Sequence, residues 1–368
     1  MLIVRSPVRI SFAGGGTDLP AYYESYGGAV LSTAINKHFY TVLHRRTDGK
    51  IQVISSDLRV VETWEDLKQT SINDSELEIP LCVLKELGVE VSLNLFMASE
   101  IPPGTGLGSS ASVCVNVLKT MATYLKLPLS KYEIAERAFY IARHILHKHV
   151  GKQDEYAAVF GGLNFIEFHQ DNSVTVQPLG LAPAALREFQ ACLLLFFTGA
   201  AHHSWTILKE QEDSTRRDKG PAVTSLHAIR GYAEEMRDAL LKLDFDRVGL
   251  LLHEGWQAKK QVSKKISTGR IDELYDAARR SGALGGKITG AGGGGFLLLY
   301  CRPEHQPRLR NVMNEMAARE MSFDFDLQGA QVIADDPFID SDTRCGSQWV
   351  FTPLSDPGLS FHPTIVKP

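Results

Sequence analysis

The sequence of 368 residues lacks long apolar runs and has few cysteines. No stretch approaches the roughly 18 uncharged apolar residues that a membrane-spanning helix needs. The first residues, MLIVRSPVRISFAGGG, lack the charged start and apolar core of a signal peptide. The five cysteines (Cys82, Cys114, Cys192, Cys301, Cys345) are scattered and show no C-x-x-C spacing. We therefore expect reduced, mostly buried thiols, no membrane partner and a cytoplasmic location.

The sequence also lacks a strong excess of charge of either sign. The net charge is −4, and the basic residues form only short pairs such as Arg45-Arg46, Arg216-Arg217 and Lys264-Lys265, a pattern typical of solvated faces. We therefore expect no nucleic-acid partner. Hydrophobic residues make up 44% of the chain and charged residues 22%. Together with the length, this composition predicts a globular protein of two domains, at roughly 150 residues per domain.

The order of the predicted elements indicates an α+β fold. The first third is rich in β-branched and apolar runs separated by Gly, Asp and Asn, which predict strands, and GGLNFIEFHQDNSVTVQPL predicts a hairpin that turns at residues 170–172. The run CLLLFFTG has the length of a buried strand. Helical periodicity follows at about 203–216, 221–243, 245–265 and 270–281, and a last helix and strand run to about residue 333. This order of strands, then helices, then strands predicts two domains, residues 1–185 and 186–334. Residues 335–368 have no helical period and are predicted to form a tail.

A glycine-rich segment, PPGTGLGSSAS (102–112), stands between a predicted strand and a predicted helix. Apolar residues alternate through VSLNLFM before it, and recur every three or four residues through ASVCVNVLKTMATYL after it. A glycine turn at the start of a helix gathers backbone N–H groups and the positive end of the helix dipole around one point. The segment therefore predicts an anion site.

Two further glycine loops are FAGGGTD (12–18) and KITGAGGGGF (287–296). One such loop alone is more often a turn. None of the three matches the Walker A pattern, because no lysine follows the second glycine, and none has the acidic residue that a dinucleotide fingerprint needs.

Four motifs in a fixed order carry a family resemblance. RSPVRISFAGGGTD, PPGTGLGSSAS, GKQDEYAAVFGG and KITGAGGGGF resemble the motifs of the GHMP small-molecule kinases, above all the branch that phosphorylates the anomeric hydroxyl of D-glycero-D-manno-heptose 7-phosphate. The likeness covers about residues 1–335. It implies an N-terminal domain similar to ribosomal protein S5 domain 2, a ferredoxin-like C-terminal domain, and ATP and a small-molecule sugar phosphate bound in the cleft. The implied activity is that of an ATP- and Mg²⁺-dependent sugar kinase.

The resemblance also implies roles for individual residues. Asp154 would accept the proton of the sugar hydroxyl, and Arg9 would stabilise charge beside it. The ATP phosphates would be held by the loop, whose glycines allow close approach of the backbone, and the Ser110 hydroxyl would bind Mg²⁺. The implied phosphate-binding residues are Pro103, Gly104, Gly106, Leu107, Gly108, Ser109 and Ser110. The implied substrate-binding residues are Gly15, Gly16, Thr17, Asp18, Lys152, Gly292 and Gly293.

Structural alternatives stand beside these roles. Asp154 could be an ordinary acid at a helix start, and Arg9 a structural ion-pair partner. Asp18 could cap a turn, and Lys152 could only solvate its loop. The glycines 292–295 could form a tight strand entry.

Two positions depart from the family pattern. Related kinases often carry a glutamate, a second Mg²⁺ ligand, twelve residues before the catalytic aspartate, where this chain has Ala142, and they tend to have an arginine where His202 stands. The sequence thus leaves open a kinase of fucose, galactose or an N-acetylhexosamine, and a non-catalytic sugar- or nucleotide-binding protein on the same fold. A homodimer is also left open. His144, His147 and His149 indicate a solvated helix end rather than a metal site, because no Cys, Asp or Glu joins them locally.

Overall fold

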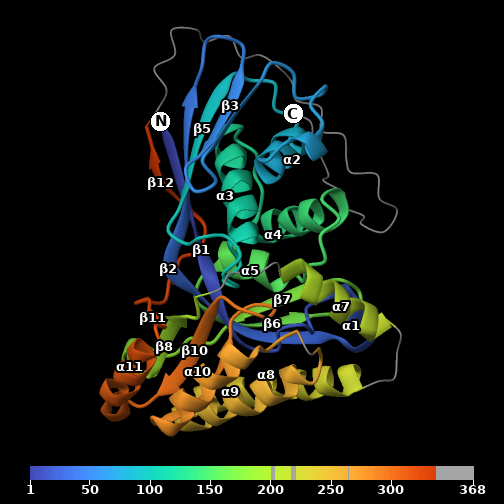
Figure 1. The fold of residues 1–368 in the computed structure, drawn as a ribbon. Helices are drawn as coiled ribbons and strands as arrows, with labels where there is room; N and C mark the ends of the chain where they lie inside the picture. Colours follow the sequence, from blue (N-terminus) through green and yellow to red (C-terminus); the bar gives the residue numbers. More distant parts are fainter. Residues whose placement is uncertain (200–203, 217–220, 264, 337–368) are drawn as a thin grey trace. The chain divides into compact units, whose positions relative to one another are not determined.

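The computed structural model describes residues 1–199, 204–216, 221–263 and 265–336, and Figure 1 shows their arrangement. His202, one of the two departures from the family pattern, and residues 337–368 of the predicted tail lie outside this part of the chain. No helix among the described residues has the length and apolar character needed to cross a membrane. The four cysteines in this part are buried free thiols, as the sequence predicts.

A sheet of eight strands forms the first layer. Its order is β12-β1-β2-β5-β3-β4, with β6 attached to β2 and β7 to β6. All neighbours are antiparallel except β3 and β5. The long strand β2 pairs first with β6 and then with β5, so it joins two parts of the sheet. The strands are β1 (Leu2–Ala13), β2 (Gly28–Arg45), β3 (Ile51–Ser55), β4 (Val60–Trp64), β5 (Leu93–Ser99), β6 (Leu163–Phe168), β7 (Val174–Pro178) and β12 (Gln331–Asp335).

Helices cover one side of this sheet. α3 packs on β1 and β2, as Figure 1 shows. Its residues Val115, Leu118 and Met121 are fully buried and spaced at helical intervals. Asn116 on the same helix donates to the backbone carbonyls of Val4 and Phe39, and so ties α3 to both strands. The helices of this part are α1 (Pro20–Tyr26), α2 (Glu78–Glu86), α3 (Ser109–Tyr124), α4 (Lys131–Tyr140), which continues into a π-helical turn (Ile141–Ile145), and α5 (Gln153–Phe160).

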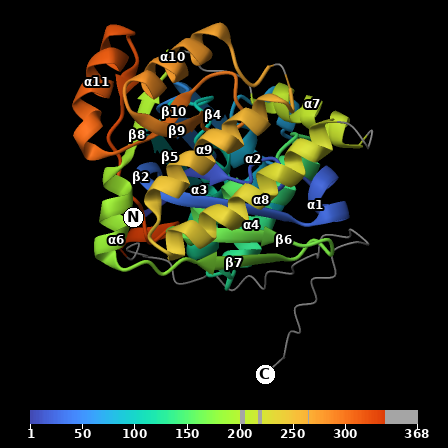
Figure 2. The ribbon, with the colours of Figure 1, turned by 90° about the horizontal axis from the view of Figure 1, so that it is seen from below.

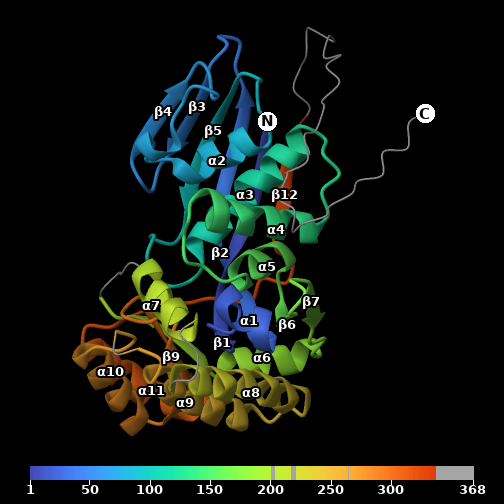
Figure 3. The same ribbon diagram turned by 90° about the vertical axis from the view of Figure 1, so that its right-hand side faces the viewer.

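A second sheet of four antiparallel strands has the order β11-β8-β10-β9. Helix α9 packs on β9 and β10 of this sheet, and α8 lies beside α9 and contacts β1 and β2 of the first sheet (Figure 2). Helix α7 packs against α1 (Figure 3). The strands are β8 (Leu193–Phe197), β9 (Ala283–Ile288), β10 (Phe296–Cys301) and β11 (Arg319–Glu320). The helices are α6 (Pro183–Ala191), α7 (Ser204–Arg216), α8 (Pro221–Leu241), α9 (Phe245–Lys260), α10 (Gly269–Arg280) and α11 (Gln306–Glu315).

The two sheets share one hydrophobic core. Buried Ile10 and Phe12 of β1 belong to the same cluster as Leu195 of β8, Leu298 of β10 and Leu251 of α9. Residues 1–336 consequently form one compact unit. Strands before residue 185 build the first sheet and later strands the second, except β12, which returns to β1. The division into domains 1–185 and 186–334 stays a prediction.

The α+β prediction is confirmed, together with the strand–loop–helix arrangement of residues 91–125 and the hairpin β6–β7. Four short helices, α1, α2, α5 and α6, were not predicted, because seven to nine residues carry too little helical period. Two of the apolar runs that predict strands in the first third, AVLSTAI and FYTVLH, belong to the single strand β2.

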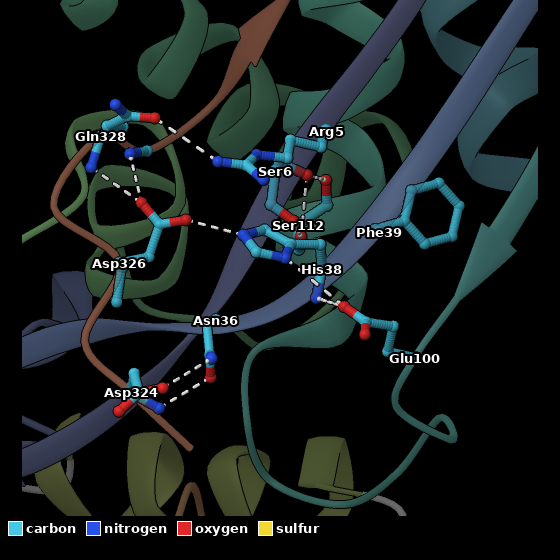
Figure 4. Close-up of polar contacts among 12 residues, drawn as sticks. Arg5, Ser6, Asn36, His38, Phe39, Glu100, Ser112, Asp324, Asp326 and Gln328 are labelled. Atoms are coloured by element: carbon cyan, nitrogen blue, oxygen red, sulfur yellow. Dashed lines mark hydrogen bonds and ion pairs between the residues drawn. The ribbon is translucent and has the colours of Figure 1, made fainter. Parts of the chain in front are cut away.

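The chain after β11 is held to the first sheet by a buried polar cluster (Figure 4). His38 Nε2 lies 2.6 Å from Asp326 Oδ2, and His38 Nδ1 lies 3.4 Å from Glu100 Oε2. Burial opposes ionisation of Asp326, but hydrogen bonds from His38 and from the backbone N–H groups of Gln328 and Gly329 lower its pKa. This segment also closes the end of α5, since the Asp326 carbonyl accepts from the N–H of residue 162.

We expect Asp326→Asn to lower the free energy of unfolding by about 2 kcal/mol, because a buried hydrogen bond to a charged group is lost. Asp324→Asn is the matched control, since Asp324 contacts Asn36 at the surface, and its cost should stay below about 1 kcal/mol. Urea unfolding measures both. The Asp326 contribution should be complete above the unfolded pKa, about 4, and should disappear as the pH falls through the lowered folded value. Equal effects of the two variants would contradict this account.

Candidate active site

All three glycine loops border one cavity of about 560 Å³. Residues 15–16 of the first loop, 103–106 and 108–111 of the second and 290–291 of the third line it, together with the start of α5. The second and third loops touch through their backbones: Gly290 is close enough to Gly106 that a Cβ there would lie 2.7 Å from the Gly106 Cα. The cavity thus lies where the two halves of the fold meet.

The second loop has the backbone of an anion site. Gly104, Gly106 and Gly108 have φ values of 74°, 80° and 78°, in the left-handed region that favours glycine. Gly108 is the N-cap of α3, and no side chain caps the helix and no acidic residue stands in its first turn. The free N–H groups of a sixteen-residue helix, with its dipole, therefore face the cavity.

Arg9 and Asp154 form an ion pair at this helix start. The Arg9 Nε and Nη2 atoms lie 2.8 Å and 2.6 Å from Asp154 Oδ1, and Nη1 donates to the Gly106 carbonyl at 2.8 Å. Arg9 is buried, whereas the Asp154 side chain is 27% exposed toward the cavity. Its second oxygen, Oδ2, lies against Gly108, where a Cβ would come within 3.1 Å. Arg9 thus fixes one oxygen of Asp154 and leaves the other beside the anion site.

Asp18 lies beside this pair and is nearly fully buried. Its Oδ1 accepts from the Gly16 N–H at 2.8 Å, and its Oδ2 accepts from the Gln153 side chain at 3.1 Å. Burial, and next the charge of Asp154, raise the pKa of Asp18. The carboxyl lines the cavity and also organises the first loop around it, so its predicted sugar-binding role stays a prediction.

Two buried lysines accompany the ion pair and were not predicted. Lys259 of α9 lines the cavity and donates to the Gly290 carbonyl. Burial, and next the charge of Arg9, lower the pKa of Lys259 to about 8. Lys287 donates to the Phe12 carbonyl at 3.3 Å, and burial, with the charge of Lys259, lowers its pKa well below the usual value. A sequence signal for Lys259 exists, because it continues the buried face of α9 one turn after Trp256.

Several buried polar atoms around the cavity have no partner. Among the described residues, eleven buried side-chain oxygen and nitrogen atoms make no hydrogen bond. Four of the eleven belong to residues that line this one cavity: Ser11 Oγ, Ser109 Oγ, Gln153 Oε1 and Glu155 Oε2. Buried polar groups are normally hydrogen-bonded. The concentration of exceptions here indicates a cavity built for a polar ligand.

Helix α7 closes one side through a buried carboxylate. Glu212 accepts hydrogen bonds from Arg143 at 2.8 Å and from His149 Nδ1 at 2.7 Å, and also pairs with Arg216. Burial opposes ionisation, but the hydrogen bonds from Arg143 and His149 outweigh it and lower the pKa of Glu212 to about 2. The neighbouring Gln211 lines the cavity and lies against Gly16. His149 is thus bound to the carboxylate of Glu212, a structural contact.

Five of the residues assigned by the resemblance do not line the cavity: Thr17, Leu107, Lys152, Gly292 and Gly293. Lys152 is buried, and its Nζ contacts both carboxylate oxygens of Glu136, at 2.9 Å and 3.0 Å, and the Asn172 carbonyl. The structure thus gives Lys152 a structural partner, and its contact with substrate stays a prediction.

The other four residues shape the loops. The hydroxyl of Thr17 bonds to the carbonyl of Gly14 in the first loop and to that of Ala29 in β2, and Leu107 packs in the core. Gly292 lies close against Ile266, and the Gly293 N–H donates to the Ile266 carbonyl at 2.8 Å. The remaining assigned residues do line the cavity, and so does Ala142 of the π-helical turn.

The residues present fit a nucleotide with Mg²⁺. The uncapped start of α3 and the cations of Arg9 and Lys259 suit phosphate groups. Oxygen donors for Mg²⁺ at the same cavity are the serine hydroxyls of residues 109 and 110 and the carboxyl of Glu155. No group of three or more His, Cys, Asp or Glu side chains in the described ranges could hold a metal by itself. Such an arrangement suits Mg²⁺, which keeps waters and shares phosphate oxygens.

Comparisons with known proteins agree with this geometry. The models of the GHMP kinases N terminal domain and the GHMP kinases C terminal domain match residues 78–162 and 236–319. The chain is 33% identical over 332 residues to D-glycero-alpha-D-manno-heptose 7-phosphate kinase of Campylobacter jejuni. The alignment covers 89% of this chain and 97% of that protein.

Two further relatives carry related names. A crystal structure of a D-glycero-D-manno-heptose 1-phosphate kinase from Bacteriodes thetaiotaomicron superposes with a TM-score of 0.77 at 29% identity, covering 92% of this chain and all of that one. An L-fucokinase/L-fucose-1-P guanylyltransferase of Bacteroides fragilis is 27% identical over 85% of this chain but only 36% of its own length. The predicted two-domain kinase fold is confirmed.

We expect Gly106→Ala to weaken ADP binding about tenfold or more, because the added Cβ would lie 2.5 Å from the Thr289 carbonyl oxygen and push the two loops apart. Gly88→Ala is the matched control: its φ of 60° is also left-handed, but nothing lies within 4 Å. Both variants should lose about 1 kcal/mol of stability from the backbone alone. Calorimetric ADP titration and thermal unfolding separate the two effects, and normal ADP affinity in Gly106→Ala would contradict the loop contact.

Proposed function

The chain belongs to the GHMP kinases, and from this premise we propose that it transfers the γ-phosphoryl group of ATP to the anomeric hydroxyl of D-glycero-D-manno-heptose 7-phosphate. The observation that carries the proposal is the Asp154 carboxylate, held by Arg9 beside the uncapped start of α3. A proton acceptor and an anion site thereby border the same cavity. The name of the 33% identical relative supports the choice of sugar.

Phosphoryl transfer depends mainly on positioning and on neutralising charge. The N–H groups of residues 104–110 would hold the ATP phosphates. Arg9 takes Asp154 Oδ1, so Oδ2 is the oxygen left to accept the anomeric proton. As that proton moves to Asp154, the anomeric oxygen bonds to the γ-phosphorus, the bond from this phosphorus to the bridging oxygen breaks, and ADP leaves.

Charge around the transferred group would come from two side chains and a metal. Arg9 and Lys259 approach the cavity from β1 and α9, on opposite halves of the fold. Mg²⁺, when bound, would neutralise the phosphate oxygens, and the Ser110 hydroxyl is the loop oxygen assigned to it. The buried free thiols of the described residues fit a reducing compartment, so we place this activity in the cytoplasm.

A non-catalytic binding protein is the second candidate, because Ala142 stands where related kinases often carry a glutamate. The open cavity and the partly exposed Asp154 carboxylate favour catalysis instead. Kinases of fucose, galactose or an N-acetylhexosamine share this machinery, and only the substrate separates them from the proposed activity.

We expect ADP release with Mg²⁺-ATP and heptose 7-phosphate, and much slower release with mannose, galactose, fucose or N-acetylglucosamine. Asp154→Asn should lower kcat by about 10²- to 10⁴-fold, the usual contribution of a general base, and should leave ADP affinity within about twofold. A coupled assay and calorimetry measure these values. Release of ADP with a neutral sugar alone would favour another branch of the family, and no release with any sugar despite ADP binding would favour the binding protein.

The lowered pKa of Lys259 predicts a pH dependence of nucleotide binding. The lysine is half neutral near pH 8 in the free protein, so metal-free ADP affinity should fall as the pH rises from 7 to 9. Lys259→Met should weaken ADP binding at pH 7 about tenfold and remove this fall. Lys260→Met is the matched control, since Lys260 pairs with Asp272 on α10 and does not line the cavity. An unchanged pH profile in Lys259→Met would contradict this assignment.

A further inference from the structure

Glu155, next to Asp154 on α5, is a carboxyl whose Oε2 atom has no partner. The residue is only 2% exposed, and Oε2 accepts no hydrogen bond. No Lys, Arg or His among the described residues forms an ion pair with it, unlike the buried Glu212, which has three basic partners. A buried carboxylate is strongly unfavourable unless it is paired or binds a metal. Glu155 therefore needs either a cation or a proton.

The surroundings of Glu155 indicate a cation that arrives with a ligand. Glu155 lines the same cavity as the phosphate loop, together with Ser109, whose Oγ is also buried and unpartnered. The helix that carries Glu155, α5, packs against α3. Cys114 is one turn after Ser110 on α3, and residues four apart share a helix face. Ser110 and Cys114 line the same cavity as Glu155.

No carboxylate is available at position 142. Ala142, from the π-helical turn, contributes only a methyl group to the lining of the cavity. Asp154 is the other carboxylate nearby, but its Oδ1 is occupied by Arg9. The second oxygen of Asp154, Oδ2, is assigned to the anomeric proton in the proposed function, which leaves the unpartnered Oε2 of Glu155 as a carboxyl oxygen of this cavity with no other role.

We propose that Glu155 is a ligand of the Mg²⁺ that accompanies the bound nucleotide, together with the Ser110 hydroxyl and the phosphate oxygens. Mg²⁺ is commonly held by one or two protein carboxylates plus substrate phosphates, with water completing the shell. The carboxylate would reach the metal from α5, so position 142 on the π-helical turn need not supply one. The inference rests on the nucleotide site of the proposed function, but not on the identity of the sugar.

Mn²⁺ as a probe tests the inference without turnover. Free Mn²⁺ is titrated by electron paramagnetic resonance in the presence of full-length protein and saturating ADP, and ADP affinity is measured separately in EDTA. We expect Glu155→Gln, which keeps shape and removes charge, to weaken Mn²⁺ binding in the ADP complex at least tenfold and to leave metal-free ADP affinity within twofold. Glu86→Gln is the matched control, because Glu86 is a largely buried carboxylate that pairs with Arg137 and does not line the cavity. It should leave both values unchanged.

Two results would overturn the inference. Mn²⁺ affinity within twofold of wild type in Glu155→Gln would mean that Glu155 is a buried neutral acid and no ligand. Equal losses of metal-free and metal-dependent ADP binding would mean that it only shapes the pocket. Failure of wild-type protein to bind ADP would instead contradict the proposed function itself. Thermal unfolding of Glu155→Gln shows whether the variant is folded. Ser110→Ala is a second variant, which removes the other proposed protein ligand at an exposed position, and it should also weaken Mn²⁺ binding.

Discussion

The ion pair of Arg9 with Asp154 is the contact on which the site depends. It joins residues 145 positions apart and, through the Gly106 carbonyl, a third segment of the chain. Its geometry requires glycine at positions 106 and 108, because side chains there would meet Thr289 and Asp154. The proton acceptor, the anion site and the loop of the second sheet are thereby held at one place, and the shared hydrophobic core keeps both sheets in position around them.

The local part of the site could be predicted from the sequence. A glycine segment between an alternating run and a helical run determines its own geometry, because the orientation of the backbone N–H groups depends only on neighbouring residues. The structure has this arrangement between β5 and α3. The resemblance also named Arg9 and Asp154, which the fold brings into contact.

The rest depended on partners distant in sequence. The partner of Lys152 is Glu136, and Gly292 packs on Ile266, so motif membership alone did not show that these residues turn away from the cavity. Conversely, the packing of α9 and α5 brings Lys259 and Glu155 to the cavity. What distinguishes these residues from other lysines and glutamates is their burial, which the sequence does not show. The contact between His38 and Asp326 could not be predicted from the sequence for the same reason, because the two residues are 288 positions apart.

The central claim is that this cavity transfers a phosphoryl group to an anomeric oxygen of a heptose phosphate. Phosphorus-31 nuclear magnetic resonance of the products formed from heptose 7-phosphate and Mg²⁺-ATP tests it most directly. The account predicts a new resonance coupled to the anomeric proton, equal in amount to the ADP formed, beside an unchanged 7-phosphate signal. Formation of ADP with inorganic phosphate only, or no reaction at all, would contradict it.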